Sequence, residues 1–219
     1  MPPAQPNHSI IAGFLVLQEV ISSGRPMGSR ELARRLAMEN SRANRILGTL
    51  VAADMLRQNS ESKYLPGPRI HVLSVLSLRA SGLIPAALPT LERFHSMGAV
   101  VALGTVWRDV VVYLLHARPE ANVAESAATH QSVPRSKSII GTVLSPGAPG
   151  SAFEDRVHTN ERAWGARIGD EHSSVALAVV LPIHHHRAEP PEDMLLQVEE
   201  AAQQIALRQG EIVKARSGD

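Results

Sequence analysis

Apolar residues recur at helical spacing in the first 50 residues of the chain. The first such segment runs from Ile10 to Ile21 and ends at the Ser-Ser-Gly of residues 22–24, shortly before Pro26. A second segment follows, in which Leu32 and Leu36 belong to the apolar side and Ser29 is expected to cap the helix. The pattern predicts two short helices before residue 38.

A third segment carries its apolar residues at i, i+3, i+4 and i+7, which is one stripe of a helix: Ala43, Ile46, Leu47 and Leu50. Strand-like residues 55–57 and 63–65 then flank the polar stretch 58–62, which predicts a hairpin. Three helices followed by a hairpin form a winged helix-turn-helix.

The polar side of the third helix suits DNA. Arginine binds phosphate or the O6/N7 edge of guanine, asparagine matches adenine, and hydroxyl groups suit phosphate or a base edge. For this helix alone an ordinary surface helix with a solvated polar face is the better interpretation, and the neighbouring helices and hairpin shift the balance. The predicted DNA-contacting residues are Ser29, Arg30, Ser41, Arg42, Asn44, Arg45, Thr49, Arg57 and Lys63.

The remainder of the chain predicts a linker helix and a mixed α/β domain. Residues 69–81 keep helical spacing, and Pro85 and Pro89 mark the start of the next region, where a helix ends near residue 97. Strands are expected over 99–106, 110–115 and 173–183, the last nearly all apolar and therefore central, with a closing helix over 191–209. The predicted domains are 1–68, 69–84 and 85–219, and the predicted fold class is α+β.

Charge divides the chain in the same way. Residues 1–84 contain ten Lys/Arg against five Asp/Glu, a net charge of +5, while residues 85–219 have a net charge of −4. The basic residues of 1–84 can displace counterions from DNA, whereas the acidic region 85–219 cannot. A basic region could bind any polyanion, and the polar side of the third predicted helix makes duplex DNA the expected partner.

The chain resembles the IclR family of bacterial transcription regulators. Residues 30–36 match the family's "ELARRLGL" helix, residues 41–50 its "STVHRLLxTL" recognition helix, and residues 64–69 the "YxLGPR" that closes the wing. The resemblance implies a winged helix-turn-helix, a linker helix and a GAF-like effector domain, with regulation of transcription as the function. Residues 173–182 and a last helix ending near Gly210 also resemble the family's final strand and helix.

A further match lies in the second half, where residues 134–142 resemble the family's "PLHATALGK", with Thr142 in place of the lysine. The resemblance implies that this segment enters an effector pocket. Its donors suit a small carboxylate or phosphate-bearing ligand. The predicted effector-binding residues are Arg135, Ser136, Lys137, Ser138, Gly141 and Trp107. Between Thr142 and Ser173 no counterpart of the family's apolar strand is visible, so the domain is expected to be shortened.

Composition excludes several classes of protein. There are no cysteines, which excludes disulfides and thiolate metal sites. Aromatic residues make up 3% of the chain, so stacking platforms for single-stranded nucleic acid are not expected. No leader-like N-terminus and no apolar run of the roughly 20 residues needed to span a bilayer is found. A soluble cytoplasmic protein without membrane contact is expected.

Other chemistry is weakly supported. Residues 184–186 are three consecutive histidines, but side chains of an extended chain alternate in direction, so a solvated loop is preferred to a metal site. No P-loop, G-x-S-x-G, H-E-x-x-H or G-x-G-x-x-G sequence occurs, and no cofactor is expected. The best hydrolase candidates would be Ser136, Ser138 or Ser174 with His158 or His172, and no spacing brings them together.

The predicted function is therefore that of a sequence-specific regulator, a repressor modulated by a small-molecule effector such as a carboxylate, and not an enzyme. A homodimer or tetramer on a pseudo-palindromic operator is expected, because one such domain buries little DNA. The apolar first helix is the expected N-terminal dimer contact. The alternative is a ligand-blind regulator whose C-terminal domain only dimerises.

Overall fold

The computed structural model describes residues 5–127, 131–183 and 193–217. The chain divides into two compact units, residues 1–77 and 78–219, and each is described by itself. The histidines at 184–186, for which a solvated loop was predicted, lie outside the described residues.

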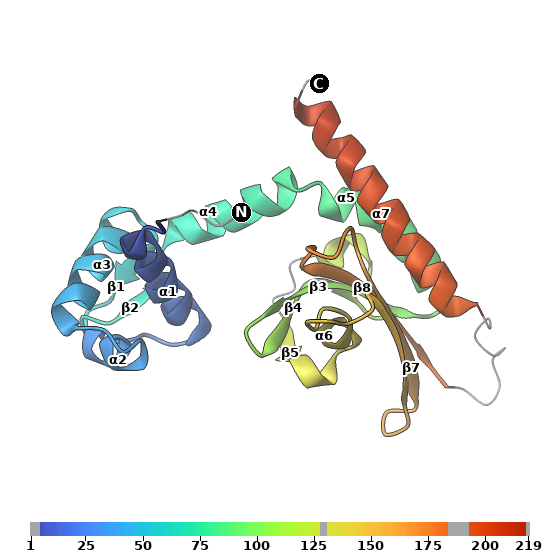
Figure 1. Cartoon of the computed structure of the whole chain (residues 1–219), viewed down its shortest axis with the longest axis horizontal. Helices are drawn as coiled ribbons and strands as arrows, with labels where there is room; N and C mark the ends of the chain where they lie inside the picture. The colour runs from blue at the N-terminus through green and yellow to red at the C-terminus, as the bar shows by residue number, and fades with distance from the viewer. Residues whose placement is uncertain (1–4, 128–130, 184–192, 218–219) are drawn as a thin grey trace. The chain divides into compact units, whose positions relative to one another are not determined.

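The first unit contains the predicted three helices and hairpin (Figure 1). These are α1 (His8–Ser22), α2 (Ser29–Arg35), α3 (Asn40–Ala52), β1 (Leu56–Gln58) and β2 (Tyr64–Pro66), with β1 and β2 antiparallel. All three helices and the hairpin contribute to one core, formed by Val16, Val20, Met27, Leu32, Leu47 and Leu56. The winged helix-turn-helix prediction is confirmed.

The ends of these helices differ from the prediction. Asn7 caps α1, since its side-chain oxygen accepts hydrogen bonds from the amides of Ser9 and Ile10. Ser29, predicted to be the cap of α2, is instead its first helical residue, and the cap position belongs to Gly28, which has no side chain to offer. A capping residue stands directly before the first helical residue. The capping prediction was wrong because Ser29 is itself the first helical residue.

The linker helix predicted after the wing is confirmed as α4 (Pro68–Ala80), in which no residue is buried. The next helix, α5 (Leu83–Ser96), follows after a short break at Gly82, whose φ is +65°. Among the described residues no single helix is long and apolar enough to cross a membrane. Only α4 and α5 together have the required length and composition, and they are bent by 65° at the break between them.

The second unit is built on one six-stranded antiparallel sheet of order β5-β4-β3-β8-β7-β6. The strands are β3 (Val100–Trp107), β4 (Val110–Ala117), β5 (Ser132–Pro134), β6 (Ser151–Arg156), β7 (Glu161–Arg167) and β8 (Val175–Pro182). The β3–β4 hairpin turns at Arg108 and Asp109, and Arg108 has a φ of +53°. The prediction that the apolar strand after residue 173 is central is confirmed, because β8 lies between β3 and β7.

Helices cover both faces of this curled sheet (Figure 1). On one face α5 and α7 (Met194–Ser217) enclose the larger core, which includes Leu91, Phe94, Trp164 and Val198. On the other face lies the short helix α6 (Ile139–Val143), preceded by two one-turn 3-10 helices, Ala124–Ser126 and Arg135–Lys137. This arrangement is the predicted α+β, GAF-like fold.

Three details of the second unit depart from the sequence analysis. The segment between Thr142 and Ser173, in which no counterpart of a family strand was visible, forms the β6–β7 hairpin. Charged residues occupy the second half of β6 and both ends of β7, so neither strand has a long apolar run. The closing helix continues past Gly210 to Ser217, and α5 begins before Pro85 and contains Pro89. Pro85 stands in the first turn of α5, where the missing N–H costs nothing.

Candidate nucleic-acid interface and effector domain

Helix α3 has one buried side and one exposed side. Ala43 and Leu47 are fully buried against the core of the first unit. The polar residues predicted to contact DNA are exposed: Ser41, Arg42, Asn44, Arg45 and Thr49. The helix is therefore held by a short apolar stripe and presents a continuous polar surface to solvent.

Some of these side chains are already engaged. The Arg42 guanidinium donates to the backbone oxygen of His8 at 3.4 Å, and the Ser41 hydroxyl donates to a Glu39 carboxylate oxygen at 3.4 Å. The Thr49 hydroxyl donates to the backbone oxygen of Arg45 at 2.9 Å, which occupies its proton. Within the described part of the chain, the side chains of Asn44 and Arg45 form no hydrogen bond or ion pair. These two are the best prepared to bind a new partner.

One exposed position on α3 was missed by the sequence analysis. Gly48 lies between Arg45 and Thr49 on the outer side of the helix, and a Cβ added there would meet nothing within 4 Å. Packing within the chain therefore does not require glycine, although glycine in a helix interior costs roughly 0.5–1 kcal/mol relative to alanine. The bare backbone at Gly48 allows close approach of a partner.

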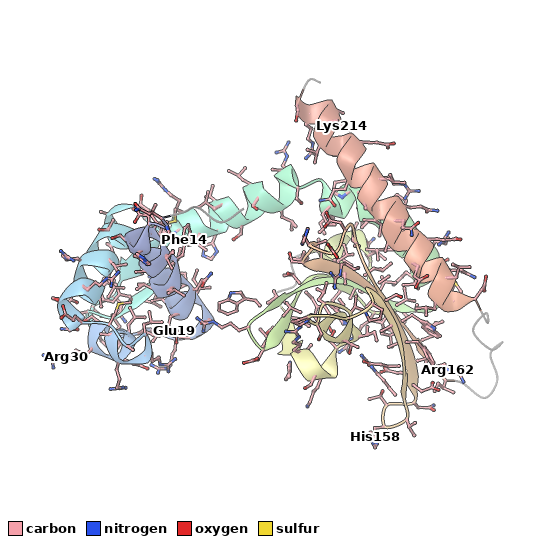
Figure 2. All side chains as sticks on the ribbon, in the orientation of Figure 1. Phe14, Glu19, Arg30, His158, Arg162 and Lys214 are labelled. Atoms are coloured by element: carbon pink, nitrogen blue, oxygen red, sulfur yellow. The ribbon has the colours of Figure 1, made fainter. Side chains whose placement is uncertain are left out.

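Helix α2 contributes mainly support. Arg35 bridges the carboxylates of Glu19 at 3.0 Å and Glu31 at 3.1 Å, and so fastens α2 to α1. Arg25 also binds Glu31, and its hydrogen bond holds the pKa of that carboxyl below the ordinary value. Ser29 is half-buried, whereas Arg30 projects into solvent (Figure 2).

The hairpin supplies two further cations. Arg57 on β1 is exposed and forms no ion pair with any described residue. The Lys63 ammonium binds the Glu61 carboxylate at 2.7 Å, which lowers the pKa of Glu61. Phosphate would therefore compete with Glu61 for Lys63, whereas Arg57 has no such competitor.

The predicted effector-binding residues are not brought together as one donor cluster. Arg135 turns back on its own segment: its guanidinium donates to the backbone oxygens of Gly141 and Leu144, at 3.4 and 3.0 Å, and to the Ser145 hydroxyl at 3.1 Å. These carbonyls belong to the C-terminal end of α6, where helical partners are lacking. Gly141 serves the same packing, because a Cβ there would lie 2.1 Å from the Arg135 oxygen.

The other predicted positions differ in exposure. Ser138 is buried and accepts a hydrogen bond from the Tyr113 hydroxyl at 3.2 Å, whereas Ser136 and Lys137 are exposed. Trp107 is half-buried, with the Arg108 guanidinium 4.6 Å from its ring centre. Arg108 therefore covers one side of the indole at the tip of the β3–β4 hairpin.

Two residues near Ser138, on the side of the sheet that carries α6, were missed by the sequence analysis. Tyr113 and His116 lie on β4 with their ring centres 4.9 Å apart. Burial lowers the pKa of the His116 imidazole, and the nearby Arg118 charge lowers it further, so both favour the neutral form of the ring. Strand alternation could have suggested Tyr113, but a β-bulge between Leu103 and Gly104 shifts the pairing of β3 with β4 and brings His116 to the same face.

The hydrolase alternative gains no geometric support. His158 lies in the β6–β7 turn (Figure 2), while His172 and Ser174 lie in the connection at the other end of β7. Ser138 is buried beneath Tyr113. Among the described residues, no hydrogen bond joins a serine of this hypothesis to one of its histidines.

Comparisons with known proteins identify the first unit. Residues 11–60 match the IclR helix-turn-helix domain. This segment runs from α1 through β1 and contains the whole of α3. No curated protein shows a significant sequence match to the chain.

The whole fold is also found in solved structures. An IclR transcriptional regulator from Alicyclobacillus acidocaldarius is 17% identical, with a TM-score of 0.64, and the alignment covers 94% of this chain and 100% of that one. An IclR family regulator from Brucella abortus is 17% identical, with a TM-score of 0.67 and coverage of 100% and 94%. An IclR homologue from Microbacterium hydrocarbonoxydans, solved with 4-hydroxybenzoate, is 19% identical, with a TM-score of 0.57 and coverage of 92% and 99%.

These findings agree with the geometry. The matched domain contains the exposed polar helix and the first strand of the wing, and the solved regulators share the sheet and helices that follow. Residues 11–60 therefore form an IclR helix-turn-helix domain, and the whole chain has the fold of solved IclR transcriptional regulators.

Proposed function

We propose that the protein is a cytoplasmic repressor that binds a pseudo-palindromic operator as a homodimer or dimer of dimers and responds to a small effector. The observation that carries the proposal is the exposed polar side of α3, with Asn44 and Arg45 unengaged by the described residues. Repression is the proposed direction because a bound dimer can cover promoter DNA without any contact to RNA polymerase.

Base recognition is assigned to Asn44 and Arg45 and positioning to their neighbours. Asparagine can bind adenine, and arginine guanine, through two hydrogen bonds each in the major groove. Ser41, Arg42 and Thr49 are proposed to add contacts at the same surface, while Ser29, Arg30, Arg57 and Lys63 bind the phosphate backbone, with the wing also able to reach the minor groove. Phosphate contacts fix the register of the helix but carry no sequence information.

Dimer formation through the first unit is supported by apolar side chains that it leaves exposed. On α1, Phe14 (labelled in Figure 2) is 60% exposed. Ile10, on the same helix, is 57% exposed. Gly13, on the same side of α1, has open space where a Cβ would stand, so a second helix can approach closely there. On α4, Val75 is 68% exposed. A second copy of the chain would cover these faces, and a two-fold pair would present two α3 helices to two half-sites.

The proposed effector face is the side of the sheet that carries α6. Tyr113, His116 and Ser138 provide neutral hydrogen-bonding groups there, and the exposed Lys137 and Ser136 add donors at its edge. Such groups suit a small molecule with a carboxylate or phenol. The Microbacterium homologue was solved with 4-hydroxybenzoate, which has both groups, and this supports a small carboxylate for the present chain. Trp107, Arg135 and Gly141 are proposed to shape this face and not to bind directly.

Operator binding and reporter expression test the proposal together. The wild-type protein should bind one duplex far more tightly than random duplex and should lower expression from a promoter that contains it. Increased expression would reverse the assigned direction, and equal binding to every duplex would exclude sequence-specific regulation.

A melting-temperature screen of small carboxylates, starting with 4-hydroxybenzoate, tests the effector face. A shift that Ser138→Ala or Lys137→Ala removes supports the effector assignment, and it should accompany a reciprocal change in operator affinity. A shift unaffected by either variant would move the site elsewhere. The absence of any shift favours the alternative function, a ligand-blind regulator whose second unit only dimerises.

A further inference from the structure

A cavity lies in the C-terminal unit, at the end of β7. Its volume is about 380 Å³, and it opens between the loop before β6, the end of β7 and the outer side of α7. The lining includes Ala166, which belongs to the core on the α5–α7 face, and it contains none of the hydrogen-bonding residues of the effector face proposed above. Ligand pockets in proteins span roughly 300–1,000 Å³. The space is sufficient for a small metabolite.

One cation lies in the wall of this cavity. The Arg167 guanidinium donates to the backbone oxygen of Val143 at 3.1 Å and to that of Glu171, which fixes its plane. Its third nitrogen, Nε, is buried and has no hydrogen-bond partner within the described structure. A buried donor without an acceptor is unfavourable, particularly in a charged group. A ligand that brings an oxygen acceptor to Arg167 after a small shift of the side chain would remove that cost.

Carboxylates surround the same cavity from two directions. Glu199 projects from α7 and accepts a hydrogen bond from the Ser151 hydroxyl, while Asp170 and Glu171 come from the turn after β7. With Arg167 the charged lining sums to a net −2. These carboxylates do not converge on one point, because no group of three metal-ligating side chains is found in the described residues. Separated carboxylates suit an organic cation with its charges spread apart, and not a metal ion.

We propose that this cavity binds a basic α-amino acid, a molecule with one carboxylate and two cationic groups. Its carboxylate pairs with Arg167, its α-ammonium with Glu199, and its side-chain cation with Asp170 and Glu171. The net charge of +1 on such a ligand opposes the negative lining, and Gln203 supplies an amide at the rim.

Helix α7 connects this cavity to the start of the unit. Two turns beyond Gln203, the Gln209 amide donates to the backbone oxygen of Ser81 at 2.9 Å, and Ile212 packs against Gly82. Arg216 donates to the backbone oxygen of Arg79, near the end of α4. A ligand that draws α7 toward the β6–β7 end would thereby act on the linker helix. This effect on DNA rests on the proposed function, whereas binding in the cavity does not.

Calorimetric titration of the full chain with L-lysine and L-arginine tests the site. Binding of either amino acid should weaken about tenfold or more in Glu199→Gln, because one charge-assisted contact is lost while Ser151 keeps an acceptor. Glu200→Gln, the exposed neighbouring position on α7, is the matched control and should leave binding unchanged. Cadaverine, which has two ammonium groups and no carboxylate, should bind much more weakly than L-lysine.

Three outcomes would overturn the site: no heat with either amino acid, equal binding by Glu199→Gln, or equal binding of cadaverine. Circular dichroism of each variant establishes that its fold is intact. Operator affinity measured with and without L-lysine then tests the coupling separately. Unchanged operator affinity despite binding would overturn the route through α7 alone, and loss of all operator binding without ligand would instead contradict the proposed function.

Discussion

The two units of the chain differ in whether their key polar side chains already have hydrogen-bond partners. In the first unit, Asn44, Arg45 and Arg57 are exposed and free of described partners, and they stand on a rigid core. In the second unit, the guanidinium of Arg135 is committed to the end of α6 and Ser138 is buried beneath Tyr113. Side chains that bind DNA must be exposed and without partners in the free protein. The polar side chains of the second unit instead form hydrogen bonds that stabilise the unit itself.

The largest expected effect comes from separating two copies of the first unit. Phe14→Glu places a charge on the exposed apolar side of α1 without entering the core, so the unit should still fold. Operator binding should fall by about 100-fold or more, because the two half-sites lose their effective-concentration gain. Sedimentation and operator titration at one salt concentration measure both properties. A dimeric variant with full operator affinity would remove α1 from the dimer contact.

Arg45→Ala separates base recognition from positioning. Specific binding should weaken by about 1–3 kcal/mol and the preference at one base pair should relax, while Lys63→Ala should weaken all duplexes alike and reduce the salt slope by about one. Titrations with operator and random duplex at several salt concentrations provide the comparison. Equal losses on both duplexes for both variants would contradict the division of roles.

Arg135→Met tests whether the second unit uses its arginine for structure. Two backbone carbonyls and the Ser145 hydroxyl lose a charged donor, and hydrogen bonds to charged groups contribute about 1.5–3 kcal/mol. The free energy of unfolding of the second unit should fall by a similar amount in urea titrations. Lys137→Met is the exposed control and should leave stability unchanged. A stable Arg135→Met protein that has lost only its effector response would reverse this assignment.

The smallest effect is expected at Gly48. Alanine there meets no neighbour in the chain and favours the helix, so Gly48→Ala should stabilise the first unit by about 0.5–1 kcal/mol. Operator affinity should nevertheless decrease, because a methyl group would stand between α3 and DNA. Thermal unfolding and operator titration of the same sample check both. Unchanged operator affinity would place Gly48 outside the interface.

How far the sequence could predict the structure also differs between the units. Helix spacing and the hairpin pattern of the first unit are local, so its elements and the exposed side of α3 followed from the residues themselves. The β6–β7 hairpin was missed because small residues such as Ala163 and Gly165, set between charged residues, carry little hydrophobic signal. The partners of Arg135 and Ser138 depend on chain folding around α6, and the β-bulge that brings His116 beside Tyr113 leaves no mark in the residue pattern.

The central claim is that two copies of α3 recognise a symmetric operator, and selection of bound sequences from a random duplex pool tests it most directly. The wild-type chain should enrich a pseudo-palindrome whose half-sites are separated by about one helical turn, roughly 10 base pairs, or a multiple of it. The same selection with Arg45→Ala should lose preference at one position in each half-site. Enrichment of a single asymmetric site, or no enrichment at all, would contradict the account.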